Sequence, residues 1–240
     1  MNLEALLSLA DTIESNRVRA MVKNILENPT LSFTSVKPKI TLEESPAAPR
    51  KHHLFPKGLM LHTYAVAMLA KAIAEVVERV YGIKVNRDLI IAAAILHDLF
   101  KFYQYDRDNI NGGYKPRDDW YMSHDYALVA ELARRGADEE LIRIATEVHG
   151  IAPITTLEGL IVHLADSIDA RLGEAIQSTI LSKAKDVEVL MGCKQVILLI
   201  EALNKYGLRY IAELAYREPD KLREVFYQLC SEMKKIRTNE

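Results

Sequence analysis

Four side chains able to bind a metal ion lie in segments that are otherwise apolar. They are His62, the pair His97-Asp98, which closes the apolar run 89–96, and Asp166. Burying an imidazole or a carboxylate costs free energy unless a cation or hydrogen bonds compensate it. We therefore expect three helices to direct these groups onto one shared cation, and imidazole with carboxylate suits Zn²⁺, Mn²⁺ or Fe.

A purely structural role remains open for each of these groups taken alone. Asp98 could pair with Lys101 or cap a loop, and a single histidine on an apolar helix face is more often a hydrogen-bonded core residue than a ligand. Three separate segments that each carry such a group favour the shared cation.

The elements that must position these groups are predicted to be helices. Gly and Pro are sparse, at 10 and 8 of 240 residues, and apolar residues recur at helical spacing through most of the chain. A connector containing several prolines, with a short strand near 31–36, and a polar aromatic loop at 103–122 interrupt the pattern. The expected helices cover 3–27, 57–81, 86–102, 125–135, 138–148, 155–183, 186–206 and 208–235, the last broken near Pro219.

Composition narrows the class of protein. The net charge of −2 gives no whole-chain positive field for a nucleic acid backbone. Cys193 and Cys230 could pair, but two thiols in an ordinary composition favour reduced core residues. The chain has no pattern typical of a signal peptide at its start, and its longest apolar run, 89–96, is too short to span a bilayer. We expect a cytoplasmic protein without membrane contact.

The set His62, His97-Asp98 and Asp166 resembles the H…HD…D signature of HD-superfamily metal-dependent phosphohydrolases, whose motif is usually followed by a lysine, here Lys101. The resemblance covers roughly residues 50–171.

In motif pattern the chain is most similar to the HD domain of YhaM-type 3′–5′ exoribonucleases. Three segments carry this likeness: 52–63, 87–89 and 149–170. The resemblance implies an all-α fold, an HD-domain helical bundle with an N-terminal helix and an extended linker packed on it. The expected divisions are 1–49 for the helix and linker, 50–184 for the HD phosphohydrolase domain, and 185–240 for C-terminal helices that complete the same globular unit.

The resemblance also implies a ligand set and a cofactor. Histidines at positions 124 and 149 are similar to those of two-metal members of the superfamily, with Asp98 bridging. Either histidine could instead be a helix-terminal surface residue. The implied cofactor is a divalent transition metal, two ions of Mn, Fe, Ni or Zn, with Mg also compatible. The implied metal ligands are His62, His97, Asp98, His124, His149 and Asp166.

The activity implied is hydrolysis of a phosphomonoester or phosphodiester, of a nucleotide or short oligonucleotide, by a metal-activated hydroxide. Asp98 and Lys101 would be catalytic, and His52, His53 and Lys101 would contact the substrate. The expected partner is a phosphorylated small molecule or nucleotide, and a homodimer is left open. RNA is less favoured, because residues 1–50 are too short for the OB-type barrel of the exoribonucleases.

Two other classes of function remain as alternatives. One is a catalytically silent HD-type regulatory module that binds a nucleotide or metal in the same pocket. The other is a structural helical protein with a buried polar cluster. A complete ligand set favours the enzyme over both.

Overall fold

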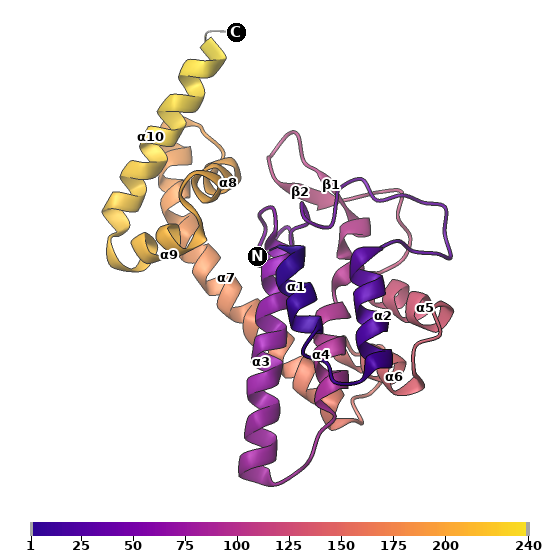
Figure 1. Cartoon of the computed structure of the whole chain (residues 1–240). Coiled ribbons are helices and arrows are strands. Elements are labelled where there is room, and N and C mark those ends of the chain that lie inside the picture. The colour runs from indigo at the N-terminus through magenta and orange to yellow at the C-terminus, as the bar shows by residue number, and fades with distance from the viewer. Residues whose placement is uncertain (1, 239–240) are drawn as a thin grey trace. The chain divides into compact units, whose positions relative to one another are not determined.

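The protein is all-α, apart from one small two-stranded sheet. The computed structural model describes residues 2–238 (Figure 1). The elements in chain order are α1 (Leu3–Ala10), α2 (Asn16–Glu27), α3 (Gly58–Tyr81), α4 (Arg87–Leu96), the 3₁₀ helix η1 (Leu99–Gln104), β1 (Tyr105–Arg107), β2 (Tyr114–Pro116), α5 (His124–Arg134), α6 (Glu139–Val148), α7 (Leu157–Met191), α8 (Gln195–Tyr206), α9 (Leu208–Arg217) and α10 (Pro219–Thr238). The prediction of an all-helical fold is confirmed.

The chain divides into two compact units. The first comprises residues 1–106 and 116–171, and the second comprises 107–115 and 172–240. This division after Arg171 differs from the predicted boundary at residue 184, and the predicted functional domains stay predictions.

Helix α4 is the centre of the first unit. It packs against α1, α2, α3 and α6, and each of its residues from Leu89 to Leu96 is buried. The Asn86 side chain is the N-cap of the helix and accepts a hydrogen bond from the Leu89 N–H. Because α4 is surrounded on all sides, its C-terminal end delivers the next two residues, His97 and Asp98, into the interior.

The first predicted helix, 3–27, is wrong, because the structure breaks it into α1 and α2. Ser15 caps α2, and the Asp88 carboxylate accepts hydrogen bonds from the Glu14 and Ser15 N–H groups at 2.8 Å each. These bonds tie the break to the beginning of α4. Apolar spacing continues through the break, so periodicity alone could not locate it. The connector contains no strand at residues 31–36, contrary to expectation.

Helix α3 carries His62 and packs mainly against α4. Its length and apolar composition are sufficient for a membrane span, a property that the core helices of soluble proteins share. Nine of its residues are buried, among them Leu59, Val66, Ala70 and Ala74. The predicted absence of membrane contact stays a prediction.

The second unit contains the C-terminal part of α7 with α8, α9 and α10. Helix α10 packs on α8 and α9, and Leu198, Ile211 and Phe226 are buried here. Helix α7 extends to Met191, eight residues beyond its predicted end, and α8 correspondingly begins later. Cys193 and Cys230 form a disulfide, with their Cα atoms 5.8 Å apart, so the expectation of two reduced thiols is wrong. The folded distance between the two cysteines, which allows this pair, could not be read from the sequence.

Candidate metal centre

Three helices of the first unit bring His62, His97, Asp98 and Asp166 together. His62 comes from the first turns of α3, His97 and Asp98 follow α4, and Asp166 lies in α7. His62 and Asp98 are fully buried, His97 is 1% exposed, and the Asp166 side chain is 20% exposed. The predicted convergence of these side chains is therefore present in the structure.

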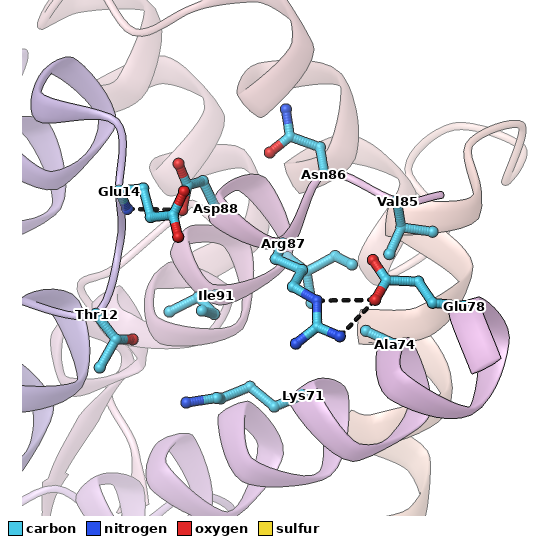
Figure 2. Close-up of a pocket in the computed structure, with 11 residues that line it drawn as sticks. Thr12, Glu14, Lys71, Ala74, Glu78, Val85, Asn86, Arg87, Asp88 and Ile91 are labelled. Atoms are coloured by element: carbon cyan, nitrogen blue, oxygen red, sulfur yellow. Dashed lines mark hydrogen bonds and ion pairs between the residues drawn. The ribbon is translucent and has the colours of Figure 1, made fainter. Parts of the chain in front are cut away.

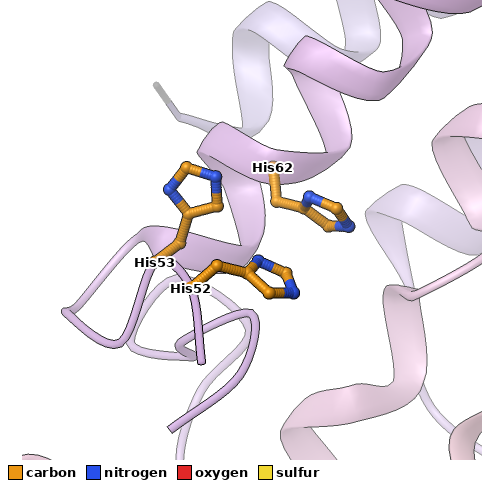
Figure 3. Close-up of side chains that lie close together, drawn as sticks. All are labelled: His52, His53 and His62. Atoms are coloured by element: carbon orange, nitrogen blue, oxygen red, sulfur yellow. The ribbon is translucent and has the colours of Figure 1, made fainter. Parts of the chain in front are cut away.

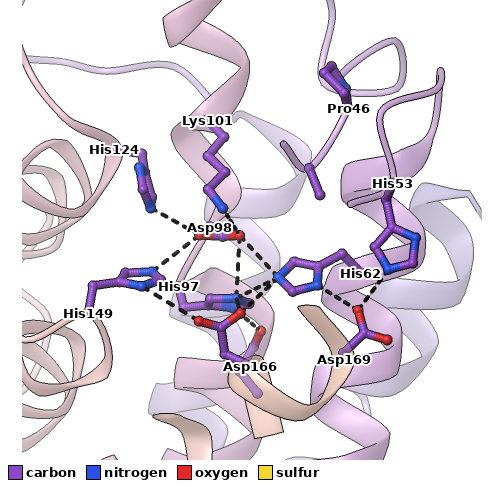
Figure 4. A network of polar contacts seen from close by, with 12 residues as sticks. Pro46, His53, His62, His97, Asp98, Lys101, His124, His149, Asp166 and Asp169 are labelled. Atoms are coloured by element: carbon purple, nitrogen blue, oxygen red, sulfur yellow. Dashed lines mark hydrogen bonds and ion pairs between the residues drawn. The ribbon is translucent and has the colours of Figure 1, made fainter. Parts of the chain in front are cut away.

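His62 lies at the middle of this first group (Figure 4). Its Nε2 atom is 3.1 Å from Oδ1 of Asp166, 3.2 Å from Oδ2 of Asp98 and 3.3 Å from Nε2 of His97. The other ring nitrogen of His97 lies 2.8 Å from the Ala94 carbonyl, to which it donates. That bond leaves the Nε2 lone pair of His97 free for the centre. The ligand atoms of these four residues all lie within 4.8 Å of one another.

A second group forms around the other oxygen of Asp98. His124 begins α5 and His149 follows α6, and their Nε2 atoms lie 3.0 and 3.2 Å from Oδ1 of Asp98. The Nδ1 atom of His124 is 3.1 Å from the side-chain oxygen of Gln104, which accepts its proton. Each oxygen of Asp98 thus faces a different group of ligand atoms, as the predicted bridging role requires (Figure 4).

The second group fits a cation better than it fits a set of hydrogen bonds. The buried Oδ1 of Asp98 and the buried Nε2 atoms of His124 and His149 have no hydrogen-bond partner among the described residues, although they lie 3.0–3.2 Å apart. Buried polar atoms without partners are costly. A cation coordinated by all three would satisfy them, so these residues suit a divalent metal ion.

The electrostatics of the cluster are also those of a cation site. Burial raises the pKa of Asp98, but Lys101, His97, His124 and His149 outweigh it and hold that pKa well below its usual value. Burial lowers the pKa of His62, but hydrogen bonds to Asp166, Asp169 and Asp98 outweigh it and raise the pKa to about 10. In the protein without metal, the buried negative charge of the carboxylates therefore draws a proton onto His62.

Lys101 and the histidine doublet flank the centre. The Lys101 Nζ lies 2.5 Å from Oδ2 of Asp98. The His52 ring centroid lies 4.9 Å from that of His62 (Figure 3). The Nε2 atom of His53 instead donates to Asp169 at 2.9 Å (Figure 4). The three residues predicted to contact substrate are thus near the centre, but His53 is engaged with a neighbouring carboxylate.

Two supporting residues, Gln104 and Glu147, were not predicted. Gln104 orients His124, and nothing in its local sequence marks that role. The Glu147 carboxylate is buried and accepts hydrogen bonds from the hydroxyls of Thr155 and Thr156, which joins the end of α6 to the beginning of α7. His163, which the sequence places one turn before Asp166, donates to the Val148 carbonyl at 2.8 Å.

A separate cavity of about 410 Å³ in the first unit is lined by the break between α1 and α2 together with α3 and α4 (Figure 2). Lys71 and Glu14 line it, and Arg87 pairs there with Glu78. The cavity contains none of the predicted site residues.

Comparisons with known proteins agree with this geometry. The model of the HD domain family matches residues 60–171. The dihydroneopterin 2′,3′-cyclic phosphate phosphodiesterase of Methanocaldococcus jannaschii is 35% identical over 191 residues, which cover 78% of this chain and 76% of that protein. The 3′–5′ exoribonuclease YhaM of Bacillus subtilis is 28% identical over 194 residues, which cover 72% of this chain and 59% of the exoribonuclease. No solved structure matches significantly.

Proposed function

Because this chain belongs to the HD domain family, and is a metal-dependent phosphohydrolase, we propose that its substrate is a small phosphodiester that carries a nucleoside or a similar heterocycle. The names of two relatives support this. One acts on a 2′,3′-cyclic phosphate, and the other removes nucleotides from RNA ends, so both break a phosphodiester bond. The alignment covers 76% of the cyclic phosphate phosphodiesterase but only 59% of the exoribonuclease. Because this chain matches more of the protein with the small substrate, we favour a small substrate over RNA.

One observation carries the proposed chemistry, which is hydrolysis of a phosphodiester at two metal ions: the two oxygens of Asp98 face two separate groups of ligand atoms. His62, His97, Asp98 and Asp166 would hold one divalent ion, and Asp98, His124 and His149 would hold the other. Two such ions, of Mn, Fe, Ni, Zn or Mg, would supply an acidified water and neutralise charge on the phosphoryl oxygens.

The chain's own residues would bind and orient the phosphate. Lys101 carries the cation nearest to Asp98 and would donate to a nonbridging phosphoryl oxygen in place of its present bond to Oδ2. His52 is buried and its Nδ1 has no hydrogen-bond partner among the described residues. It would therefore provide a second hydrogen-bond donor to the phosphate.

The direct test is a hydrolysis assay with three substrates: dihydroneopterin 2′,3′-cyclic phosphate, adenosine 2′,3′-cyclic phosphate and a short RNA. Each is assayed with Mn²⁺, Fe²⁺, Ni²⁺, Zn²⁺ and Mg²⁺. We expect hydrolysis of at least one cyclic phosphate, its loss with a chelator, and its loss in Asp98→Ala with the helical circular dichroism retained. Hydrolysis of RNA alone, or full activity of Asp98→Ala, would contradict the proposal.

A further inference from the structure

One carboxylate oxygen of Asp169 holds two histidines from different elements. Its Oδ2 atom lies 2.6 Å from Nδ1 of His62 in α3 and 2.9 Å from Nε2 of His53 in the preceding turn (Figure 4). Asp169 is 4% exposed, so water competes little for these bonds. A carboxylate that accepts from Nδ1 of a histidine selects the tautomer whose Nε2 lone pair can bind a metal.

The turn before α3 is built so that the His53 ring can reach Asp169. His53 and Lys57 have positive φ angles of 47° and 66°, which are uncommon for residues other than glycine. Gly58 is required, because a Cβ atom there would lie 2.0 Å from the His53 carbonyl oxygen. The N–H groups of Ala47 and Ala48 donate to the carbonyls of His53 and His52 at 3.1 Å each, which anchors the turn to the connector.

The rings of His52 and His53 point in different directions (Figure 3), and their hydrogen-bond partners differ. His52 has a buried Nδ1 atom without a partner among the described residues. The Nε2 atom of His53 is already hydrogen-bonded to Asp169. The ligand atoms of His52, His53 and His62 lie close enough to suggest a further metal site, but Asp169 already satisfies one nitrogen of both His53 and His62.

We propose that Asp169 and His53 are positioning residues that act through His62 on the metal centre, and that His52 alone of the doublet contacts the substrate. Asp169 orients the His62 ring, and His53 holds the Asp169 carboxylate and the turn in place. The role of His52 as a substrate contact rests on the proposed function. The roles of Asp169 and His53 require only that the centre binds a metal ion.

The test measures the affinity of the purified chain for Mn²⁺ and Zn²⁺ alone, by competition with a fluorescent chelator. We expect Asp169→Asn to weaken metal binding by about 10- to 100-fold, the usual effect of removing a partner of a metal-bound histidine. His53→Ala should weaken it by about tenfold, at the lower end of that range, because it acts one bond further away. His53→Gln keeps a donor and should recover most of the loss.

Glu131→Gln is the matched control, since Glu131 is a fully buried carboxylate that pairs with Arg135 and accepts from the Ser32 N–H, and it has no part in the centre. Its metal affinity should equal that of the wild type. In the metal-free protein, ¹H–¹⁵N spectra of the histidine rings should show a downfield Nδ1 proton of His62 hydrogen-bonded to carboxylate. Asp169→Asn should remove that signal, and Glu131→Gln should keep it.

His52→Ala separates the two members of the doublet. It should leave metal affinity within about twofold of wild type and raise KM for the cyclic phosphate, whereas His53→Ala at saturating metal should leave KM unchanged. Wild-type metal affinity in Asp169→Asn with the His62 signal retained would overturn the positioning role. If the wild type hydrolyses no phosphate ester but the affinities change as expected, the proposed function fails and the positioning roles stand.

Discussion

Lys101 and Asp98 form a partly buried ion pair in which the ammonium group lies 2.5 Å from Oδ2, the same oxygen that faces His62. His62, His97, Asp98 and Asp166 would hold a metal ion here, and Asp98 could not then keep both this ion and its present bond to Lys101. The ammonium group of Lys101 would be available to donate to the phosphate of the substrate.

Replacing this lysine should separate metal binding from turnover. Lys101→Met should lower kcat/KM by about 100- to 1,000-fold, the usual effect of losing one donor to a developing charge. Its metal affinity should stay equal to or above that of the wild type, because a competing cation is gone. Lys71→Met, in the separate cavity, is the control. Unchanged kcat/KM in Lys101→Met would exclude a catalytic role.

The number of ions can be counted directly. We expect about two equivalents of Mn²⁺ per wild-type chain by elemental analysis after gel filtration, as a two-metal site requires. The double variant His124→Ala/His149→Ala should retain about one, because the four residues of the first group remain. One equivalent in both proteins would show that the second group binds no ion of its own.

Glu147 provides a test of how the centre is held together. Burial raises its pKa, but hydrogen bonds from the side chains and backbone of Thr156 and Thr155 outweigh it and hold the pKa below the ordinary value of 4.5. A carboxyl whose folded pKa is lowered stabilises the protein above its unfolded pKa, and that stabilisation is lost as pH falls. Glu147→Gln should therefore lower the free energy of unfolding at pH 7 by about 1–3 kcal/mol.

The difference in free energy of unfolding between wild type and Glu147→Gln should shrink as pH is lowered from 6 toward 3. Urea unfolding at each pH measures this difference. Gly159 gives an independent check, since a Cβ atom there would lie 2.2 Å from Oε2 of Glu147. Gly159→Ala should also be destabilising. If the difference in free energy of unfolding between wild type and Glu147→Gln stayed constant across this pH range, the charge of Glu147 would contribute nothing to stability.

Much of the centre could be predicted because its ligands lie in helices that are apolar on most sides. His62 and Asp166 lie in mostly apolar stretches of α3 and α7, and the His97-Asp98 pair directly follows the apolar helix α4. Burying such groups is costly unless they converge on a shared partner. Their spacing along the chain also resembles the family signature. The helices themselves followed from apolar periodicity, which reports the buried face of each one.

The features that were missed depend on contacts between residues far apart in the chain. The break between α1 and α2 is stabilised by Asp88, 73 residues beyond Ser15. The cysteine pair spans 37 residues, and no local pattern distinguishes it from two reduced thiols. The doublet at 52–53 was predicted to have one role, but the positive φ of His53 and its bond to Asp169 give the two rings different surroundings.

The aromatic loop before α5 offers a place for the heterocycle of the proposed substrate. Trp120 is the only tryptophan in the sequence, and its ring lies 5.3 Å from those of Tyr103 and Tyr121. Tyr121 is 71% exposed and lies three residues before His124, so the chain places their Cα atoms at most about 11 Å apart. A base stacked on the rings of Trp120 and Tyr121 would contribute about 1–3 kcal/mol to the free energy of binding.

Fluorescence of Trp120 reports on this stacking directly. Lys101→Met with bound Mn²⁺ should bind adenosine 2′,3′-cyclic phosphate with little turnover, and the base should quench the tryptophan signal. Ribose 2′,3′-cyclic phosphate, which lacks the base, should bind more weakly and leave the signal unchanged. Tyr121→Ala should weaken binding of the adenosine compound alone, whereas Tyr81→Ala, which removes an equally exposed ring at the end of α3, should not. Equal binding of the two cyclic phosphates would show that the loop does not recognise the base, because stacking is the contact that only the adenosine compound can make.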